Sequence, residues 1–252
     1  GEQLTLVTPL EPFQEIANHV MSSKSTFFFN NSKLDVNLGL TYNDRKEFEE
    51  HHHDDEDHDE HEEEEEDEHD EHDEHDEEAE AAALHTKLKT LNYDVKYHLP
   101  ELGKFETIIG IQGLTQSNTN YGEEKLIPDA KANDIGFFAT SHIHFKNTDI
   151  QIGVRYDNRN IDVISGLNKN FNSFNGAIGV KTNITDNFIA RVNLASGFRA
   201  PNLAELTSDG VHHGTNRYEI GNDNLISEQN FQTDIALEYK SEHVEVFANV
   251  FY

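Results

Sequence analysis

Histidine and carboxylate side chains are concentrated in one stretch, residues 49–80, which holds 8 His, 23 Asp or Glu and no Lys or Arg. The histidines are His51, His52, His53, His58, His61, His69, His72 and His75. Ala79 is the only apolar residue, so the stretch has no hydrophobic surface that could offset the entropy cost of ordering it. We therefore predict a disordered, acidic, His-rich loop over residues 49–83 that binds metal ions.

The ligand types narrow the choice of metal. Imidazole suits Zn²⁺, Ni²⁺ and Cu²⁺, whereas Ca²⁺ and Mg²⁺ sites use oxygen ligands. The chain has no Cys and one Met, which excludes thiolate sites and a Cu(I) cluster. The sequence thus predicts zinc, with nickel or copper next, and binding that weakens as pH falls through about 6.5 because a ligating imidazole must be neutral. The alternative is a solvated acidic loop whose histidines are incidental.

Two further groups of residues could bind the ion. The first lies in the predicted loop 200–228 and consists of Asp209, His212, His213 and Glu219. The second is His142 and His144, whose i, i+2 spacing places both side chains on one face of a strand. Each has a structural alternative: surface histidines in a polar loop for the first group, and polar lining of the sheet for the second.

Charge and motifs exclude several classes of function. The formal charge is −30, of which −23 comes from residues 49–80, leaving −7 for the rest of the chain. Nucleic acid is not expected as a partner, because phosphate binding requires clustered Lys and Arg. We find no nucleophile with a base, no phosphate-binding glycine loop and no positioned carboxylate pair, so the protein is not expected to be an enzyme.

Outside the acidic stretch, apolar and polar residues alternate with the period of two that is typical of β-strands. Leu34, Val36, Leu38 and Leu40, for example, interleave with Asp35, Asn37 and Gly39. The pattern predicts about ten strands, near residues 14–29, 33–47, 85–99, 104–117, 133–146, 149–162, 171–183, 187–199, 229–240 and 243–252.

The connections between these strands alternate in length. Short ones, such as Asn147-Thr148, alternate with long ones at 48–84, 118–132, 163–170 and 200–228. This arrangement is typical of an antiparallel transmembrane β-barrel, which has tight turns on one side of the membrane and long extracellular loops on the other. The apolar face would contact outer-membrane lipid and the polar face would line the lumen. A soluble all-β domain that buffers metal or mediates adhesion remains the alternative of another class.

Residues 196–228 read SGFRAPNLAELTSDGVHHGTNRYEIGNDNLISE. This segment resembles the late-barrel signature of TonB-dependent outer-membrane receptors. The segment Ser208 to His213, together with a His-rich outer loop, is similar to the zinc-uptake branch of that family. The resemblance implies a bacterial outer-membrane location and import of a bound metal with energy from the TonB complex.

Members of the family have about twice as many strands and an N-terminal plug domain that contacts TonB. We therefore interpret residues 1–252 as a partial receptor barrel that lacks the plug and the remaining strands. The function expected of the whole receptor is capture and import of a divalent transition metal, zinc first. A siderophore or haem receptor of the same fold is the alternative.

Overall fold

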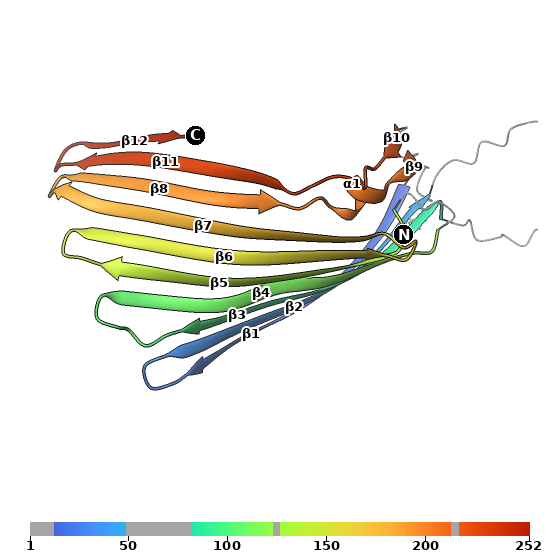
Figure 1. Ribbon diagram of the computed structural model, residues 1–252, viewed down its shortest axis with the longest axis horizontal. Helices are drawn as coiled ribbons and strands as arrows, with labels where there is room; N and C mark the ends of the chain where they lie inside the picture. Colours follow the sequence, from blue (N-terminus) through green and yellow to red (C-terminus); the bar gives the residue numbers. More distant parts are fainter. Residues whose placement is uncertain (1–12, 49–81, 123–126, 213–216) are drawn as a thin grey trace, which may run out of the picture.

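The computed structural model describes residues 13–48, 82–122, 127–212 and 217–252. Ten strands form one antiparallel sheet in the order β1-β2-β3-β4-β5-β6-β7-β8-β11-β12, and each strand except β8 pairs with the next strand along the chain (Figure 1). Their bounds are β1 Phe13–Phe28, β2 Lys33–Phe48, β3 Leu84–His98, β4 Phe105–Asn120, β5 Ala130–His144, β6 Thr148–Val163, β7 Asn168–Thr185, β8 Phe188–Arg199, β11 Glu228–Lys240 and β12 Glu245–Phe251. The sheet curves without closing.

Short and long connections between the strands alternate as predicted. The short turns lie at one end of the sheet, and the long connections lie at the other, where the grey traces emerge in Figure 1. One connection is shorter than expected, because residues 164–167 alone join β6 to β7. The Asn-rich ends of these two strands stay paired up to Asp162 and Asn168, and Gly166 provides the positive φ of 105° that the turn needs.

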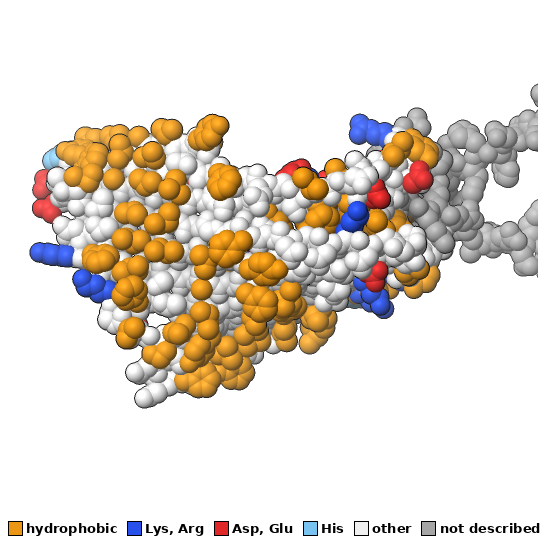
Figure 2. Space-filling view, viewed as in Figure 1, with side chains coloured by type: hydrophobic (Ala, Val, Ile, Leu, Met, Phe, Trp, Pro, Cys, Tyr) orange, Lys and Arg blue, Asp and Glu red, His pale blue; other side chains and the backbone are white. Residues whose placement is uncertain are grey.

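The two faces of the sheet differ in polarity. One face carries large exposed apolar side chains on every second residue, such as Leu40, Leu91, Phe137, Ile152 and Val154. The other carries ion pairs between strands, including Arg159 with Asp134 and Arg191 with Glu238. Figure 2 shows hydrophobic side chains gathered over the half of the sheet nearer the short turns. This is the distribution of a barrel wall, with a lipid-facing side and a polar lumen.

The apolar face changes character toward the long loops. On β6, Ile150, Ile152, Val154 and Tyr156 point to the apolar face, but Asn158 and Asn160 follow on the same face. Asn158 donates to Asn170 and Asn172 of β7, forming a polar ladder. The apolar residues move to the opposite face, where Ile161 and Val163 are each 2% exposed. The switch places the edge of the hydrocarbon layer just beyond Tyr156.

A small core fills the lumen side above this level. Ala130, Ile161, Val163 and Phe171 from the wall pack with Ala200 and Leu206 from the segment after β8. This segment was predicted as a long loop. The structure instead places in it the helix α1 (Leu203–Thr207) and a hairpin of β9 (Asp209–His212) and β10 (Arg217–Ile220).

Helix α1 is short enough that external contacts must hold it, since a helix of one to two turns is not stable alone. Asn202 caps it and forms a reciprocal capping box with Glu205. Arg199 at the end of β8 binds Glu205 through two hydrogen bonds of 2.8 and 2.9 Å, and also binds Glu228 at the start of β11. Arg199 therefore joins β8, α1 and β11 at the long-loop end of the sheet.

These three charged groups lie beyond the membrane-spanning part of the strands. The pKa of Glu205 is lowered, first by the hydrogen bond from the Asn202 backbone and then by Arg199. Arg199 also lowers the pKa of Glu228, and its own pKa is raised by hydrogen bonds to the two carboxylates. All three groups are consequently charged at neutral pH.

No helix among the described residues is long and apolar enough to cross a membrane.

Candidate metal site

The candidate metal site lies on the polar face near the short turns. His142 and His144 occupy alternate positions at the end of β5, and Glu106 stands directly opposite His142 at the start of β4. The i, i+2 spacing brings the two rings to a centroid distance of 5.8 Å, as the sequence predicted. The β4–β5 register adds the carboxylate of Glu106, which was not among the predicted residues.

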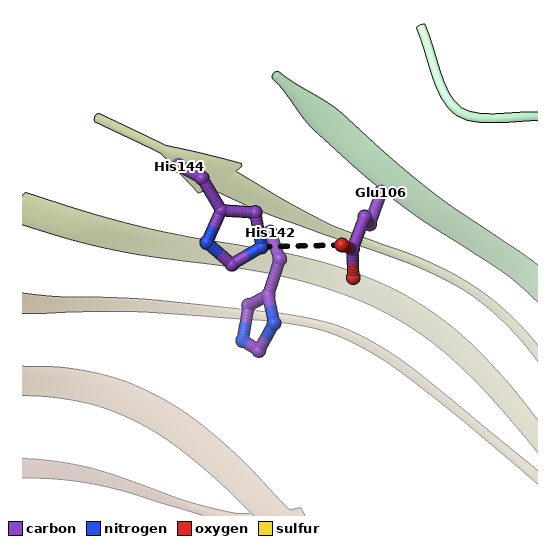
Figure 3. Close-up of side chains that lie close together, drawn as sticks. All are labelled: Glu106, His142 and His144. Carbon is purple, nitrogen blue, oxygen red and sulfur yellow. Dashed lines mark ion pairs between the residues drawn. The ribbon is translucent and has the colours of Figure 1, made fainter. Parts of the chain in front are cut away.

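The three side chains converge (Figure 3). One ligand atom from each of Glu106, His142 and His144 lies within 4.8 Å of the other two. The His144 Nε2 atom is 3.4 Å from Glu106 Oε1. Two imidazoles and one carboxylate are the donor set of open zinc sites, in which a water or another ligand takes the fourth position. Within residues 13–48, 82–122, 127–212 and 217–252, no other group of three His or carboxylate residues meets the same distance limit.

Asp149 orients one of the predicted ligands. It lies opposite His144 across the turn to β6, and its Oδ1 atom is 2.9 Å from His144 Nδ1. In the neutral tautomer that donates Nδ1–H to this carboxylate, Nε2 carries no proton and can bind a metal ion, an arrangement common at zinc-binding histidines. The sequence held a signal for Asp149, because the short turn of residues 145–147 joins β5 to β6, but not for Glu106, because β4 and β5 are joined by the longer connection 121–129 at the other end of the sheet.

The site is accessible from the lumen side. Glu106, His142 and His144 are exposed, and His142 borders two cavities, of about 430 Å³ and about 280 Å³. The smaller cavity is also lined by Asp149, Lys181 and Arg191. An exposed site with few ligands binds and releases ions readily, which suits a step in transport better than a structural metal centre.

Of the other predicted ligands, those among the described residues do not join this cluster. His51, His52, His53, His58, His61, His69, His72 and His75 lie outside the described residues, as does His213. The backbone of His212 pairs with Arg217 in the β9–β10 hairpin. In the same hairpin, Asp209 stands opposite Ile220 and Glu219 stands opposite Gly210, so their side chains leave from opposite faces. Asp209 accepts a hydrogen bond from Tyr218, which raises the pKa of the tyrosine.

The flanking strands nevertheless fix where the acidic stretch attaches. Glu47 of β2 pairs with Leu84 of β3, so residues 49–81 leave and return at the long-loop end of the sheet. The Glu106–His142–His144 site lies at the opposite end, one strand length of 15 residues away. At about 3.4 Å per residue this separation is about 50 Å along the strand.

Comparison with known proteins identifies the class. Residues 21–252 match the family described as TonB dependent receptor-like, beta-barrel. The chain therefore belongs to the β-barrel family of TonB-dependent receptors, which are bacterial outer-membrane proteins. This confirms the predicted fold and location and excludes the soluble β-domain. No curated protein matches the chain significantly.

Solved structures share the fold at low sequence identity. The FrpB iron transporter of Neisseria meningitidis has a TM-score of 0.65 and 13% identity over 95% of this chain and 36% of its own. The ferric yersiniabactin uptake receptor FyuA of Yersinia pestis has a TM-score of 0.60 and 10% identity, with coverages of 95% and 36%. The copper transporter OprC has a TM-score of 0.61 and 12% identity, with coverages of 93% and 38%. The chain thus spans little more than a third of these receptors.

Proposed function

We propose that this chain is the part of a TonB-dependent receptor that captures and imports a divalent transition metal, with Zn²⁺ as the preferred ion and Ni²⁺ or Cu²⁺ as alternatives. The observation that carries the proposal is the convergence of Glu106, His142 and His144, with Asp149 orienting His144. The His-rich residues 49–80 supply a second, independent set of imidazoles at the extracellular end.

The two sets have different tasks in this proposal. The acidic, His-rich residues raise the local metal concentration outside through their charge and through weak, multivalent chelation. Asp209, His212 and Glu219 of the β9–β10 hairpin, together with His213, which follows His212 in the sequence, would receive the ion. The Glu106–His142–His144 site then holds it at the end of the lumen near the periplasm. Passage between the sites requires the plug domain and energy from the TonB complex, both of which belong to the whole receptor.

A ferric-chelate receptor of the same fold is the second candidate. It is favoured by the names of FrpB and FyuA, which are iron and ferric yersiniabactin receptors. Such a ligand needs free cationic side chains in the lumen, but Arg155, Arg159 and Arg191 each form an ion pair with an acidic neighbour. The lumen wall described here is therefore better suited to a bare cation than to an anionic chelate.

The test is zinc binding by the full-length receptor with and without residues 49–80. Removing the acidic stretch isolates the inner site, and calorimetry should then report one zinc ion per receptor. The zinc affinity of the double variant His142→Asn/His144→Asn should be at least about tenfold lower, because mutating even the groups that surround a metal ligand costs about 10-fold in affinity or more. The control His243→Asn removes an exposed imidazole in the turn between β11 and β12, four strands from β5 in the sheet, and should change nothing. Equal affinity in all three proteins would contradict the proposal.

A further inference from the structure

The smaller cavity beside the candidate metal site, about 280 Å³ in volume, is lined by polar side chains as well as by the two histidines. Most of its lining comes from two adjacent rungs on the lumen face of the sheet. One rung runs from Glu106 of β4 through His142, Gln151 and Gly179 to Asn193 of β8, and the other runs from His144 of β5 through Asp149 and Lys181 to Arg191 of β8. The imidazoles therefore come from one side of the cavity, and the side chains of β6, β7 and β8 come from the other.

Three side chains of this lining have hydrogen-bond donors to spare. Within the part of the chain that the structure describes, Gln151, Lys181 and Asn193 form no ion pair and no side-chain hydrogen bond. Asn193 extends over β7, because a Cβ atom at Gly179 would lie only 2.7 Å from its Oδ1 atom. Lys181 is two strands from His144, a backbone separation of about 10 Å that a lysine side chain and a small ligand can bridge. These donors can therefore meet a negatively charged ligand of the metal.

The charged groups around the cavity favour an anion only when a metal ion is present. Three carboxylates, Glu106, Asp149 and Glu238, stand against two cations, Lys181 and Arg191. Without metal the group therefore carries one net negative charge, which repels an anion. A divalent ion changes this to one net positive charge, which a single monovalent anion neutralises. Because Arg191 is already bound to Glu238 at 2.8 Å, Lys181 is the cation that remains for the ligand.

We propose that the cavity holds a small monocarboxylate as the fourth ligand of the bound metal ion. The inference rests on the proposed function, since the anion binds the metal held by Glu106, His142 and His144, a donor set that leaves the fourth position open. One carboxylate oxygen would bind the metal, and the other would accept hydrogen bonds from Lys181 and Asn193. Chloride has no second atom for these donors, and phosphate exceeds the single charge that the cavity neutralises.

The size of the cavity separates this ligand from an organic chelator. Pockets for drug-sized organic molecules have volumes of about 300–1,000 Å³, whereas this cavity measures about 280 Å³. The metal ion would therefore reach the site without a chelator and acquire the carboxylate there. Because the coupling between two bound ligands is reciprocal, zinc and the carboxylate should raise each other's affinity by the same factor.

The test is calorimetric zinc titration of the full-length receptor without residues 49–80, in acetate and in a sulfonate buffer of equal ionic strength. Acetate should raise the zinc affinity at least about fivefold, the lower end of typical coupling between sites. Lys181→Gln should remove this gain, and Lys181→Arg, which keeps the charge, should retain it. Gly179→Ala should reduce the gain, because the added Cβ displaces Asn193. The matched control Lys24→Gln removes an exposed lysine from the lumen face of β1, four strands from β5, and should behave as the parent.

The outcomes separate this inference from the function on which it rests. Zinc binding that depends on His142 and His144 but is equal in acetate and sulfonate would overturn the carboxylate ligand and leave the metal site intact. The absence of zinc binding in both buffers would overturn both. An equal gain in chloride or phosphate would also overturn the proposal, because it would indicate a general anion site. Isotope-labelled acetate, followed by its NMR line width, should bind only after zinc is added, and binding without zinc would contradict the charge argument.

Discussion

A single arginine placed at two heights on β6 tests where the membrane lies. Val154 is near the middle of the apolar series that runs from Ile150 to Tyr156, and it is 44% exposed on that face. Asn160 lies six residues farther along β6, toward the long loops, and points to the same face. We predict that Val154→Arg destabilises the whole receptor strongly and that Asn160→Arg does not.

The magnitude follows from the geometry of the strand. Six residues at about 3.4 Å each make about 20 Å along the strand. With a tilt of about 40°, the height difference is about 15 Å, more than half of an apolar band about 25 Å tall. An arginine costs about 2–4 kcal/mol near the midplane and about 0–1 kcal/mol at the interface. The two variants should therefore differ by about 2 kcal/mol, or about 30-fold in the folding equilibrium.

The assay is guanidinium unfolding of the receptor in phospholipid vesicles, followed by the mobility difference between folded and unfolded barrels on gels. Asn160→Arg is the matched control, because it adds the same side chain to the same face of the same strand. If Val154→Arg and Asn160→Arg cost the same small amount, the face is not in hydrocarbon and the assignment of the membrane edge beyond Tyr156 is wrong.

Three further outcomes follow from the segment after β8 and from the acidic stretch. Leu206 is 3% exposed, so Leu206→Ala should cost about 2–5 kcal/mol of local stability and release α1. Hydrogen exchange of residues 203–207 would show this release as a loss of protection. Unchanged protection would contradict the packing of Leu206 in the core. The pKa values of Glu205 and Glu228 are lowered in the folded protein, so the Arg199 contacts should be fully present above the ordinary Glu pKa of about 4.3 and be lost as pH falls through the lower, folded values. Exchange measured across this range should show protection of α1 falling in acid, and Arg199→Met should remove only part of that pH dependence, because the hydrogen bond from the Asn202 backbone also lowers the pKa of Glu205. Deleting residues 49–80 should slow the uptake of radiolabelled zinc at limiting zinc and leave uptake at saturating zinc unchanged. If the deletion variant and the parent receptor take up zinc at the same rate at limiting zinc as well, the capturing role is refuted.

The strands were predictable from sequence because alternation is a direct consequence of facing lipid on one side and water on the other. All ten strands of the large sheet lie within a few residues of the predicted ranges. The errors fall where this environment ends. Beyond Tyr156 the apolar residues change face. The predicted strand 149–162 includes Asn158 and Asn160, but the predicted strand 171–183 leaves out Asn168, Lys169 and Asn170, with which β7 begins.

Local signals also explain what was missed after β8. The capping box of Asn202 and Glu205 marks a helix start, but five residues show no helical period. Burial of Leu206 and the contacts of Arg199 come from residues distant in the fold. For the candidate site, the His142 and His144 spacing was visible in one strand. Glu106 and Asp149 required the registers of two neighbouring hairpins, which a sequence pattern does not specify without the turn lengths.

The central claim is that the receptor containing this chain binds a bare divalent transition metal. Elemental analysis of the purified full-length receptor, after equilibration with equimolar Zn²⁺ and a ferric chelate, tests it most directly. We predict bound zinc in the parent receptor and, after deletion of residues 49–80, one remaining equivalent that His142→Asn/His144→Asn removes. Iron bound with its chelator, and no divalent metal above the level of the variants, would contradict the claim.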